Sequence, residues 1–217
     1  LLTAGVRRLP RYDPLGDYAT LMLRPRGRAL PDGVTLAGSG DAAELDAFLA
    51  ARLSARQLAP CWQTADIGWP LLVLRRHGAI AGCAGVWDQR AFRQVVVRGY
   101  PRGLAALRPL ANLAAPLLRL PSLPAVGAVI PQGSLSPLLL ADDKDRAGFA
   151  ALLAAARAQA ATMGLGVLTM GLAWGHPWRG WVPRAVLYRT RLFLAHWGAE
   201  WQGLALGTLP MPEVSLL

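Results

Sequence analysis

Cysteine and histidine are scarce in this sequence, and their scarcity excludes several classes of site. The two cysteines, Cys61 and Cys83, lie 22 residues apart, without a CxxC pair or a nearby histidine. We therefore expect neither a disulfide framework nor a zinc site, and a reducing compartment favours the cytoplasm. Three scattered histidines make no metal triad, so we expect no metal.

Long charge-free helices and several catalytic motifs are also missing. Two charge-free windows, 120–141 and 158–178, approach membrane-spanning length, but the first contains four prolines and the second four glycines. Neither window is predicted to span a membrane. The patterns GxxxxGK[ST], HExxH and GxSxG are absent, so the sequence does not predict a P-loop, a metalloprotease or a hydrolase.

Acidic residues are few, and the net charge is +10 with a pI near 11.1. Such a charge raises nucleic acid or an anionic membrane as partners. However, 22 of the 23 basic residues are arginines, and they are scattered, with no run longer than a pair such as Arg7 and Arg8. This pattern is typical of coding bias as well as of selection, and it disfavours a dedicated nucleic-acid surface.

The chain is long enough for one domain plus an extension. We interpret residues 1–31 as an N-terminal extension and residues 32–217 as the domain. The segment DYATLML at 17–23 predicts a strand, and we hypothesise that it is the closing strand of a preceding module in a tandem protein.

Apolar spacing and turn residues predict the remaining elements. Asp41 and Glu44 are typical of a capping box at the start of a helix. The prolines at 109 and 116 predict two short helical pieces rather than one helix between 101 and 120. The other expected elements are a strand at 34–37, a helix from 41 to about 56, a hairpin of strands 71–75 and 79–87, extended chain at 92–97, a Pro-rich connector up to 132, a short helix at 177–184, and strands at 188–197 and 212–217.

The most informative stretch runs from Ser134 to Ala173 and predicts a strand, a helix and a second strand. The apolar segments SLSPLLLA and LGVLTMGLA flank a helical run with buried positions at three- and four-residue steps, which ends at Gly164. A helix that joins two buried strands and begins with small residues is a common nucleotide-binding unit, because its first N–H groups can approach a phosphate.

This order of elements resembles the GNAT acyltransferase superfamily over about residues 31–217. The resemblance implies an α/β (α+β) fold with a mixed, splayed central sheet flanked by helices, here with a helical insertion between the third and fourth strands. The family fingerprint Q/RxxGxG/A falls on residues 145–150. Gly148 and Ala150 match it, whereas Asp145 stands where Gln or Arg is usual, with Arg146 one place along.

The resemblance also implies acetyl-CoA, or another acyl-CoA, as donor substrate. The residues it assigns to donor binding lie on the fourth strand and the following helix: Leu138, Leu139, Leu140, Arg146, Ala147, Gly148, Phe149 and Ala150. Pro137 lacks an N–H, so it marks either the end of strand pairing or simply an edge or bulge. Asp142, Asp143 and Asp145 would repel a phosphate, or they serve only to cap the helix.

Catalytic and acceptor residues are expected on both sides of this unit. In the family a tyrosine often protonates the departing thiolate, and Tyr188 is the nearest counterpart; alternatively it only packs. His176 is a candidate base, or it caps a helix. Trp87, Asp88, Gln89 and Tyr100 flank the insertion and are candidates for acceptor binding, unless the insertion merely covers a sheet face.

The resulting hypothesis is the transfer of an acyl group, most simply acetyl, from acyl-CoA to a primary amine of a small molecule or a protein. One alternative is a GNAT-like module that binds CoA or regulates without turnover, as the degenerate fingerprint suggests. A further alternative, which the scattered arginines disfavour, is a nucleic-acid-binding module.

Overall fold

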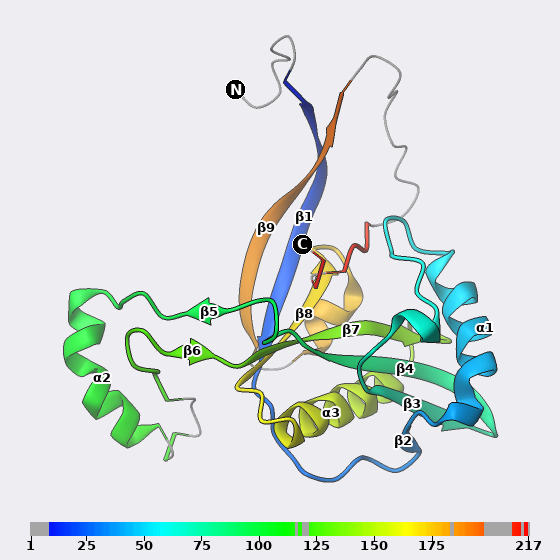
Figure 1. The fold of residues 1–217 in the computed structure, drawn as a ribbon, viewed down its shortest axis with the longest axis horizontal. Coiled ribbons are helices and arrows are strands. Elements are labelled where there is room, and N and C mark those ends of the chain that lie inside the picture. Colours follow the sequence, from blue (N-terminus) through cyan, green and yellow to red (C-terminus); the bar gives the residue numbers. More distant parts are fainter. Residues whose placement is uncertain are drawn as a thin grey trace.

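The computed structural model describes residues 9–115, 117–118, 122–182, 185–197, 210–213 and 215–216. A seven-stranded sheet with strand order β2-β3-β4-β7-β8-β1-β9 forms its centre (Figure 1). Its strands are β1 (Arg11–Leu23), β2 (Val34–Leu36), β3 (Leu71–Arg76), β4 (Ala79–Asp88), β7 (Gln132–Leu140), β8 (Val167–Ala173) and β9 (Val186–His196). The helices are α1 (Ala42–Leu53), α2 (Arg102–Ala114) and α3 (Arg146–Thr162), with short 3₁₀ turns η1 (Ser39–Asp41), η2 (Thr64–Asp66) and η3 (Pro177–Trp181). Strands β5 (Val95–Val96) and β6 (Val129–Ile130) form a separate two-stranded sheet.

The strand, helix and strand predicted at 134–173 are confirmed as β7, α3 and β8. β7 and β8 run parallel, whereas all other neighbouring strands in the large sheet are antiparallel. A parallel pair requires a crossover connection, which α3 provides. The mixed α/β architecture and the insertion between β4 and β7 are therefore as predicted.

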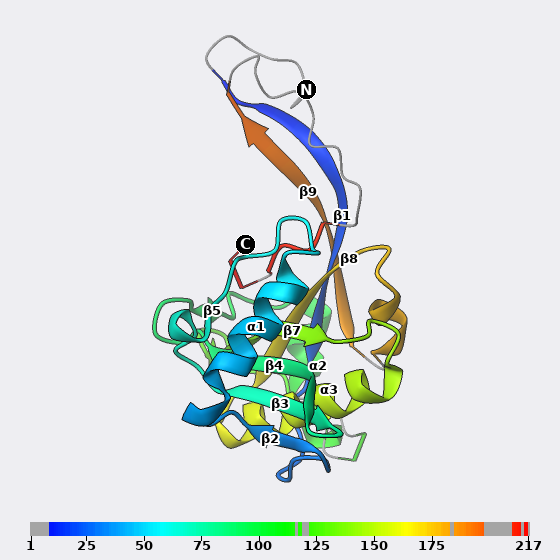
Figure 2. The ribbon, with the colours of Figure 1, turned by 90° about the vertical axis from the view of Figure 1, so that its right-hand side faces the viewer.

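Two hydrophobic clusters cover the two faces of the sheet, because the side chains of a strand alternate between faces. In β3, Leu72 and Leu74 pack in the cluster that contains Phe149 and Leu152 of α3. Leu71 and Val73 of the same strand pack with the buried leucines of α1. The two helices consequently lie on opposite faces of the sheet, as Figures 1 and 2 show.

The hairpin between β3 and β4 forms as predicted. Its two turn residues, His77 and Gly78, both have positive φ, at 52° and 83°. A two-residue turn with positive φ at both positions matches the right-handed twist of the flanking strands. The glycine tolerates this conformation without steric cost.

The predicted capping box of α1 is wrong. Asp41 makes no side-chain capping bond to the helix. Instead, Asp41 and Glu44 both contact the guanidinium of Arg75, at 2.8 and 2.7 Å, and Glu44 also accepts a hydrogen bond from the backbone N–H of Ile80. Asp41 Oδ2 accepts from the backbone N–H of Gly38 at 2.7 Å and so caps the preceding turn η1 rather than α1.

The insertion also differs from the prediction. α2 is one helix with Pro109 inside it, not two pieces. The carbonyl of Ala105 lacks the helical N–H that Pro109 cannot supply, but Ala105 is exposed, so water can satisfy it. The Pro-rich connector after α2 contributes β6, which pairs with β5.

The two ends of the chain lie differently from their predicted places. The strand expected at 17–23 forms as part of the longer β1, between β8 and β9 in the large sheet. Residues 11–23 thus belong to the same sheet as the predicted domain, and their origin in a preceding module stays a prediction. The strand expected at 212–217 is wrong for the described residues 212–213 and 215–216, which form no strand.

The β1–β9 ribbon projects beyond the rest of the sheet (Figures 1 and 2). β1 pairs with β9 from Arg11 onward but with β8 only from Tyr18 onward. Within the ribbon, the carboxylate of Asp17 contacts both Arg189 and Arg191 of β9. These ion pairs connect β1 and β9 next to the part of the ribbon that β8 does not pair with.

Replacing Gly85 of β4 with alanine should destabilise the protein. A Cβ at this position would overlap the carbonyl oxygen of Ser136 and come within 2.7 Å of Nε1 of Trp69. We expect Gly85→Ala to lower the free energy of unfolding, measured with urea, by about 1–3 kcal/mol. Gly99→Ala is the control, because a Cβ there meets open space, and it should change the stability by less than about 0.5 kcal/mol. Equal free energies of unfolding for Gly85→Ala and Gly99→Ala would contradict this close packing of β4 against β7.

Candidate active site

The candidate site lies where β7 separates from β8. The two strands pair at three positions, the last being Ser134 with Thr169. β7 continues to Leu140 and β8 to Ala173 without further pairing between them, so a V opens toward their C-terminal ends. Pro137 lies three residues beyond the last pair. The N-terminus of α3 follows β7 at the open end of this V.

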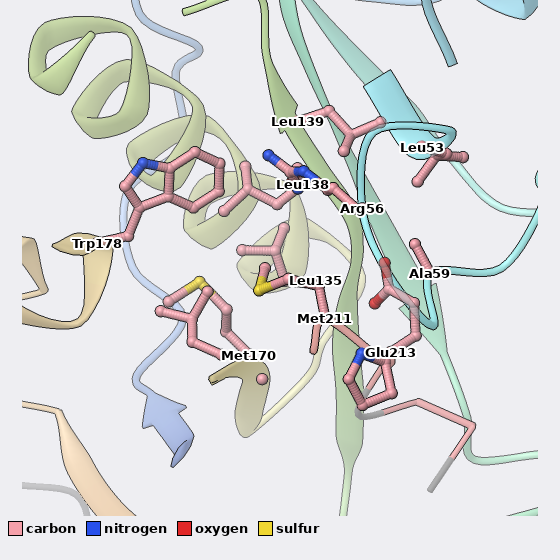
Figure 3. A pocket seen from close by; sticks show the side chains of 13 residues that line it. Leu53, Arg56, Ala59, Leu135, Leu138, Leu139, Met170, Trp178, Met211 and Glu213 are labelled. Carbon is pink, nitrogen blue, oxygen red and sulfur yellow. The ribbon is translucent and has the colours of Figure 1, made fainter. Parts of the chain in front are cut away.

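Side chains from several segments close the V around a cavity of about 20 Å³, enough for one water molecule. Figure 3 shows Arg56, Trp178 and Glu213 reaching this space from three different parts of the chain. Leu138 of β7 and Met170 of β8 form its apolar walls.

Arg56, which follows α1, binds the backbone carbonyl of Leu138, a residue that we expected to contact the donor. Its Nη1 donates to the carbonyl oxygen of Leu138 at 3.2 Å, and its Nη2 donates to Oδ1 of Asp143 at 2.9 Å. Its guanidinium also lies 5.2 Å from the centre of the Trp178 ring. Burial lowers the pKa of Arg56, and the charge of Asp143 partly offsets that effect.

Glu213 places a buried carboxyl group in the V, and the sequence prediction missed it. Burial raises its pKa from the ordinary 4.5 to about 7, against the opposing effects of a hydrogen bond with Ser136 and of the Arg56 charge. A carboxyl group that titrates near neutral pH in a cleft is typical of catalytic sites. Its only signal in the sequence is a single acidic residue within the apolar ending MPEVSLL.

Polar contacts hold Glu213 in place through the C-terminal segment, by which we mean residues 210–213 and 215–216. The hydroxyl of Tyr18 donates to the carbonyl oxygen of Pro212 at 2.5 Å. The hydroxyl of Ser215 donates to that of Ser136 at 3.2 Å, and Gln89 Nε2 donates to the Ser215 carbonyl at 3.1 Å. The segment is thus attached to β1, to β7 and to the residue that follows β4.

At the start of α3, a side chain of the protein occupies the place predicted for phosphate. Asp145 is the N-cap, and its Oδ1 accepts from the backbone N–H of Gly148 at 2.9 Å. It also pairs with Arg76 at 2.6 Å. A Cβ on Gly148 would overlap the Asp145 carboxylate, so this glycine serves the cap whether or not a ligand binds. Of the two interpretations of the acidic turn, helix capping is therefore the one that Asp145 fits.

The structure divides the other predicted donor residues into two groups. Leu139 and Leu140 are buried and pair with Cys83 and Gly82 of β4. Phe149 is also buried, with its ring centre 5.2 Å from that of Trp178 and 5.5 Å from that of Trp181. Only Arg146, Ala147 and Ala150 are exposed.

A groove of about 520 Å³ runs along this exposed flank of α3. Arg26, Arg146 and Arg157 line it, alanines of α3 form its floor, and no carboxylate is among its lining residues. The pKa of Arg157 is lowered by burial and by the charges of Arg26 and Arg24. The groove therefore suits an anion. Arg146, Ala150 and Arg157 follow one another at helical spacing, a signal that could have revealed it.

Of the predicted catalytic residues, His176 lies near the V and Tyr188 does not. Nδ1 of His176 accepts from the N–H of Trp178 at 3.2 Å, which caps η3. Burial, reinforced by Arg56, lowers the pKa of His176 to about 4. Tyr188 is 59% exposed on β9, and both β8 and β1 lie between its strand and β7.

Three of the four predicted acceptor residues gather at the end of β4. Trp87 stacks on Trp69 with ring centres 4.2 Å apart. Asp88 is bound by Arg90 at 2.6 Å. Gln89 is buried, and its Oε1 has no hydrogen-bond partner in the described part of the chain. The structure does not group Tyr100 with them, because its hydroxyl donates to the carbonyl of Pro124 within the insertion.

Two parallel strands that separate into a V, with a helix starting at the open end, are the distinguishing feature of this mixed α/β fold. No protein-family model and no curated protein matches the chain. Among solved structures, it is similar to a protein from Novosphingobium aromaticivorans DSM 12444 that bears the description "Putative Acetyltransferase from the GNAT family". The identity is 14% and the TM-score 0.44, over 83% of this chain and 66% of that chain. This chain thus spans less than two thirds of that structure.

Two kinds of feature are absent from the described residues. None of the helices there is long and apolar enough to cross a bilayer. Nor do the described His, Cys, Asp and Glu residues come together in a group of three that could hold a metal ion.

Glu213 should make the stability depend on pH. Because its pKa is about 7 in the folded protein and 4.5 ordinarily, the folded state binds more protons between these values. The free energy of unfolding should therefore fall as pH rises through this window, by on the order of 3 kcal/mol from this group. Urea titrations from pH 4 to 8 should show Glu213→Gln gaining stability relative to the wild type, while the exposed control Asp32→Asn should not. His176 titrates in both proteins, so its effect cancels. If the free energies of unfolding of wild type and Glu213→Gln differ by the same amount from pH 4 to 8, the pKa assignment is refuted.

Proposed function

We propose that this chain transfers an acyl group, most simply acetyl, from acyl-CoA to a primary amine. The observation that carries the proposal is the V between β7 and β8, which opens at the N-terminus of α3 and contains a carboxyl group with a pKa of about 7. The backbone groups of β7, this proton acceptor and the cationic groove along α3 support the proposal.

The α3 groove suits the nucleotide part of the donor. Its volume of about 520 Å³ falls in the range of small-molecule sites. The guanidinium groups of Arg26, Arg146 and Arg157 can bind phosphates through charge-assisted hydrogen bonds, and the alanines of α3 leave room beside the helix. The indole of Trp181 at the edge of the groove offers a face for stacking.

The acyl-bearing end of the donor would lie in the V. The cavity in the V has room for one water molecule. Entry of the acyl-bearing end therefore requires Arg56 to leave the carbonyl of Leu138 and the C-terminal segment to shift. The donor would then exchange hydrogen bonds with β7 that Arg56 now makes.

The chemistry requires one proton acceptor beside the thioester. The amine nitrogen attacks the thioester carbonyl carbon, a C–N bond forms, and the C–S bond breaks to release CoA as thiolate, which takes up a proton. Glu213 removes the proton from the attacking amine. A pKa close to the working pH suits a general base, because the group is largely deprotonated yet still basic.

A second candidate function is a CoA-binding module without turnover. The observations that favour it are the occupied Leu138 carbonyl and the cap made by Asp145. Both groups are already satisfied within the protein, so a ligand must displace existing contacts to use them.

Binding of CoA should depend on the α3 groove. We expect acetyl-CoA and CoA to raise the thermal unfolding temperature, since a ligand that binds only the folded state stabilises it. Arg146→Gln with Arg157→Gln should weaken CoA binding at least about tenfold. Arg93→Gln with Arg98→Gln, which removes equal charge from the insertion, should leave it unchanged. No stabilisation of the wild type by either compound would overturn the proposal, and equal weakening by both double variants would contradict the role of the groove.

Turnover should require deprotonated Glu213. With acetyl-CoA and a panel of amines, thiol release should give a kcat/KM that rises with pH and levels off above a pKa of about 7. Glu213→Gln should remove this limb and lower kcat by about 10²- to 10⁴-fold. His176→Asn should keep the limb, because the pKa of His176 is about 4. CoA binding without thiol release across the panel would favour the second candidate, and loss of the limb in His176→Asn would move the base role to histidine.

A further inference from the structure

The insertion between β4 and β7 forms an arm that projects from the body of the protein. We use "the arm" for residues 92–131 as far as they are described; it contains β5, α2 and β6. Figure 1 shows α2 at its far end, away from the large sheet. No residue of α2 is fully buried.

The amphipathicity of α2 is inverted relative to that of an ordinary surface helix. Two of its three polar side chains face the connector that follows the helix: Arg108 Nε donates to the carbonyl of Leu123 at 3.1 Å, and Asn112 makes two hydrogen bonds with the backbone of the same residue, at 3.0 and 2.6 Å. A surface helix usually turns its apolar side inward instead.

The leucines of α2 consequently face outward. Their exposed fractions rise along the helix, and Leu117 and Leu118 extend the surface. The exposed fractions are 39% for Leu104, 57% for Leu107, 65% for Leu110, 80% for Leu113, 86% for Leu117 and 61% for Leu118. A contiguous apolar patch of this kind marks an interaction site, because exposed isolated leucines are common but rows of them are not.

The charge around the leucines identifies the partner. Residues 89–141 contain no aspartate or glutamate and six arginines. Arg93, Arg98 and Arg102 are exposed at the base of the arm and at the start of α2. The partner must therefore offer an apolar layer next to negative charge.

We propose that α2 binds the surface of a lipid bilayer that contains anionic lipid. The leucines would insert at the boundary between headgroups and acyl chains, and the arginines would contact lipid phosphates. A helix of 13 residues is about 20 Å long, too short to span a bilayer, so it lies in the plane of the membrane.

Two other partners fit the same observations less well. A second copy of the chain would bring two arms together that carry arginines and no carboxylates, and like charges oppose that contact. Nucleic acid would satisfy the arginines but leave the leucines in water. The proposal is independent of the acyl-transfer function, since neither the V nor the α3 groove takes part.

Vesicle sedimentation tests this proposal. We expect the wild type to bind vesicles of phosphatidylcholine with about 30% phosphatidylglycerol, and to bind at least about tenfold less to phosphatidylcholine alone or at high salt. Leu107→Gln, Leu110→Gln and Leu113→Gln together should reduce binding to anionic vesicles at least about tenfold. The control carries Leu9→Gln, Leu36→Gln and Leu187→Gln, which replaces three exposed leucines elsewhere, and should bind like the wild type.

The outcomes separate the possible partners. Circular dichroism and urea unfolding show whether each variant remains folded. The comparison of wild-type binding between anionic and neutral vesicles depends on no variant. Absence of wild-type binding to anionic vesicles would overturn the proposal. So would a concentration-dependent dimer in sedimentation that the α2 variant alone abolishes, because a second copy would then cover the leucines. Salt-sensitive binding to DNA that survives the leucine substitutions, without vesicle binding, would also overturn it.

Discussion

The separation of β7 from β8 after Ser134 is the constraint on which the rest of the structure depends. Separated strands leave buried backbone groups without ladder partners, and such groups must be satisfied elsewhere. The Leu138 carbonyl accepts from Arg56. The Ser136 carbonyl, which lies against Gly85 where the β4–β7 register shifts, accepts from Trp69 Nε1 at 2.7 Å. The C-terminal segment completes the arrangement through Ser215. The same interactions that stabilise the V also fill it, so any ligand that enters must compete with contacts of the protein itself.

The distribution of charge follows from the same arrangement. Several carboxylates are engaged by arginines where segments meet: Asp143 by Arg52 and Arg56, and Asp145 by Arg76. With few carboxylates in the chain, the excess positive charge is concentrated on surfaces that lack them. The α3 groove and the arm are two such surfaces. They differ in shape, since the groove is concave and lined by small residues, whereas the arm presents a row of leucines.

Much of the fold was predictable because local rules and tertiary packing agree there. Apolar spacing and Gly164 predicted α3, and Gly78 predicted the hairpin turn. Prediction failed where distant segments decide. Arg75 pairs with Asp41 and Glu44, and the Asp41 side chain makes no capping bond to α1. Exposure to water lets Pro109 stay within α2. At the candidate site, His176, a candidate base, caps η3 beside Trp178, whereas Tyr188 lies across two strands. Glu213 and Arg56 were missed, because only the folded chain brings them together.

The sequence by itself determined the order of strands and helices, the apolar faces that pack them, and a chain with a large excess of arginine. These features depend on spacing along the chain and on composition. Only the tertiary structure decided that β7 and β8 separate, that the C-terminal segment occupies the V, and that the leucines of α2 face outward. Each of these depends on contacts between residues far apart in sequence. Burial by distant segments, rather than residue type, brings the pKa of Glu213 to about 7 and so makes this carboxyl group the proposed base.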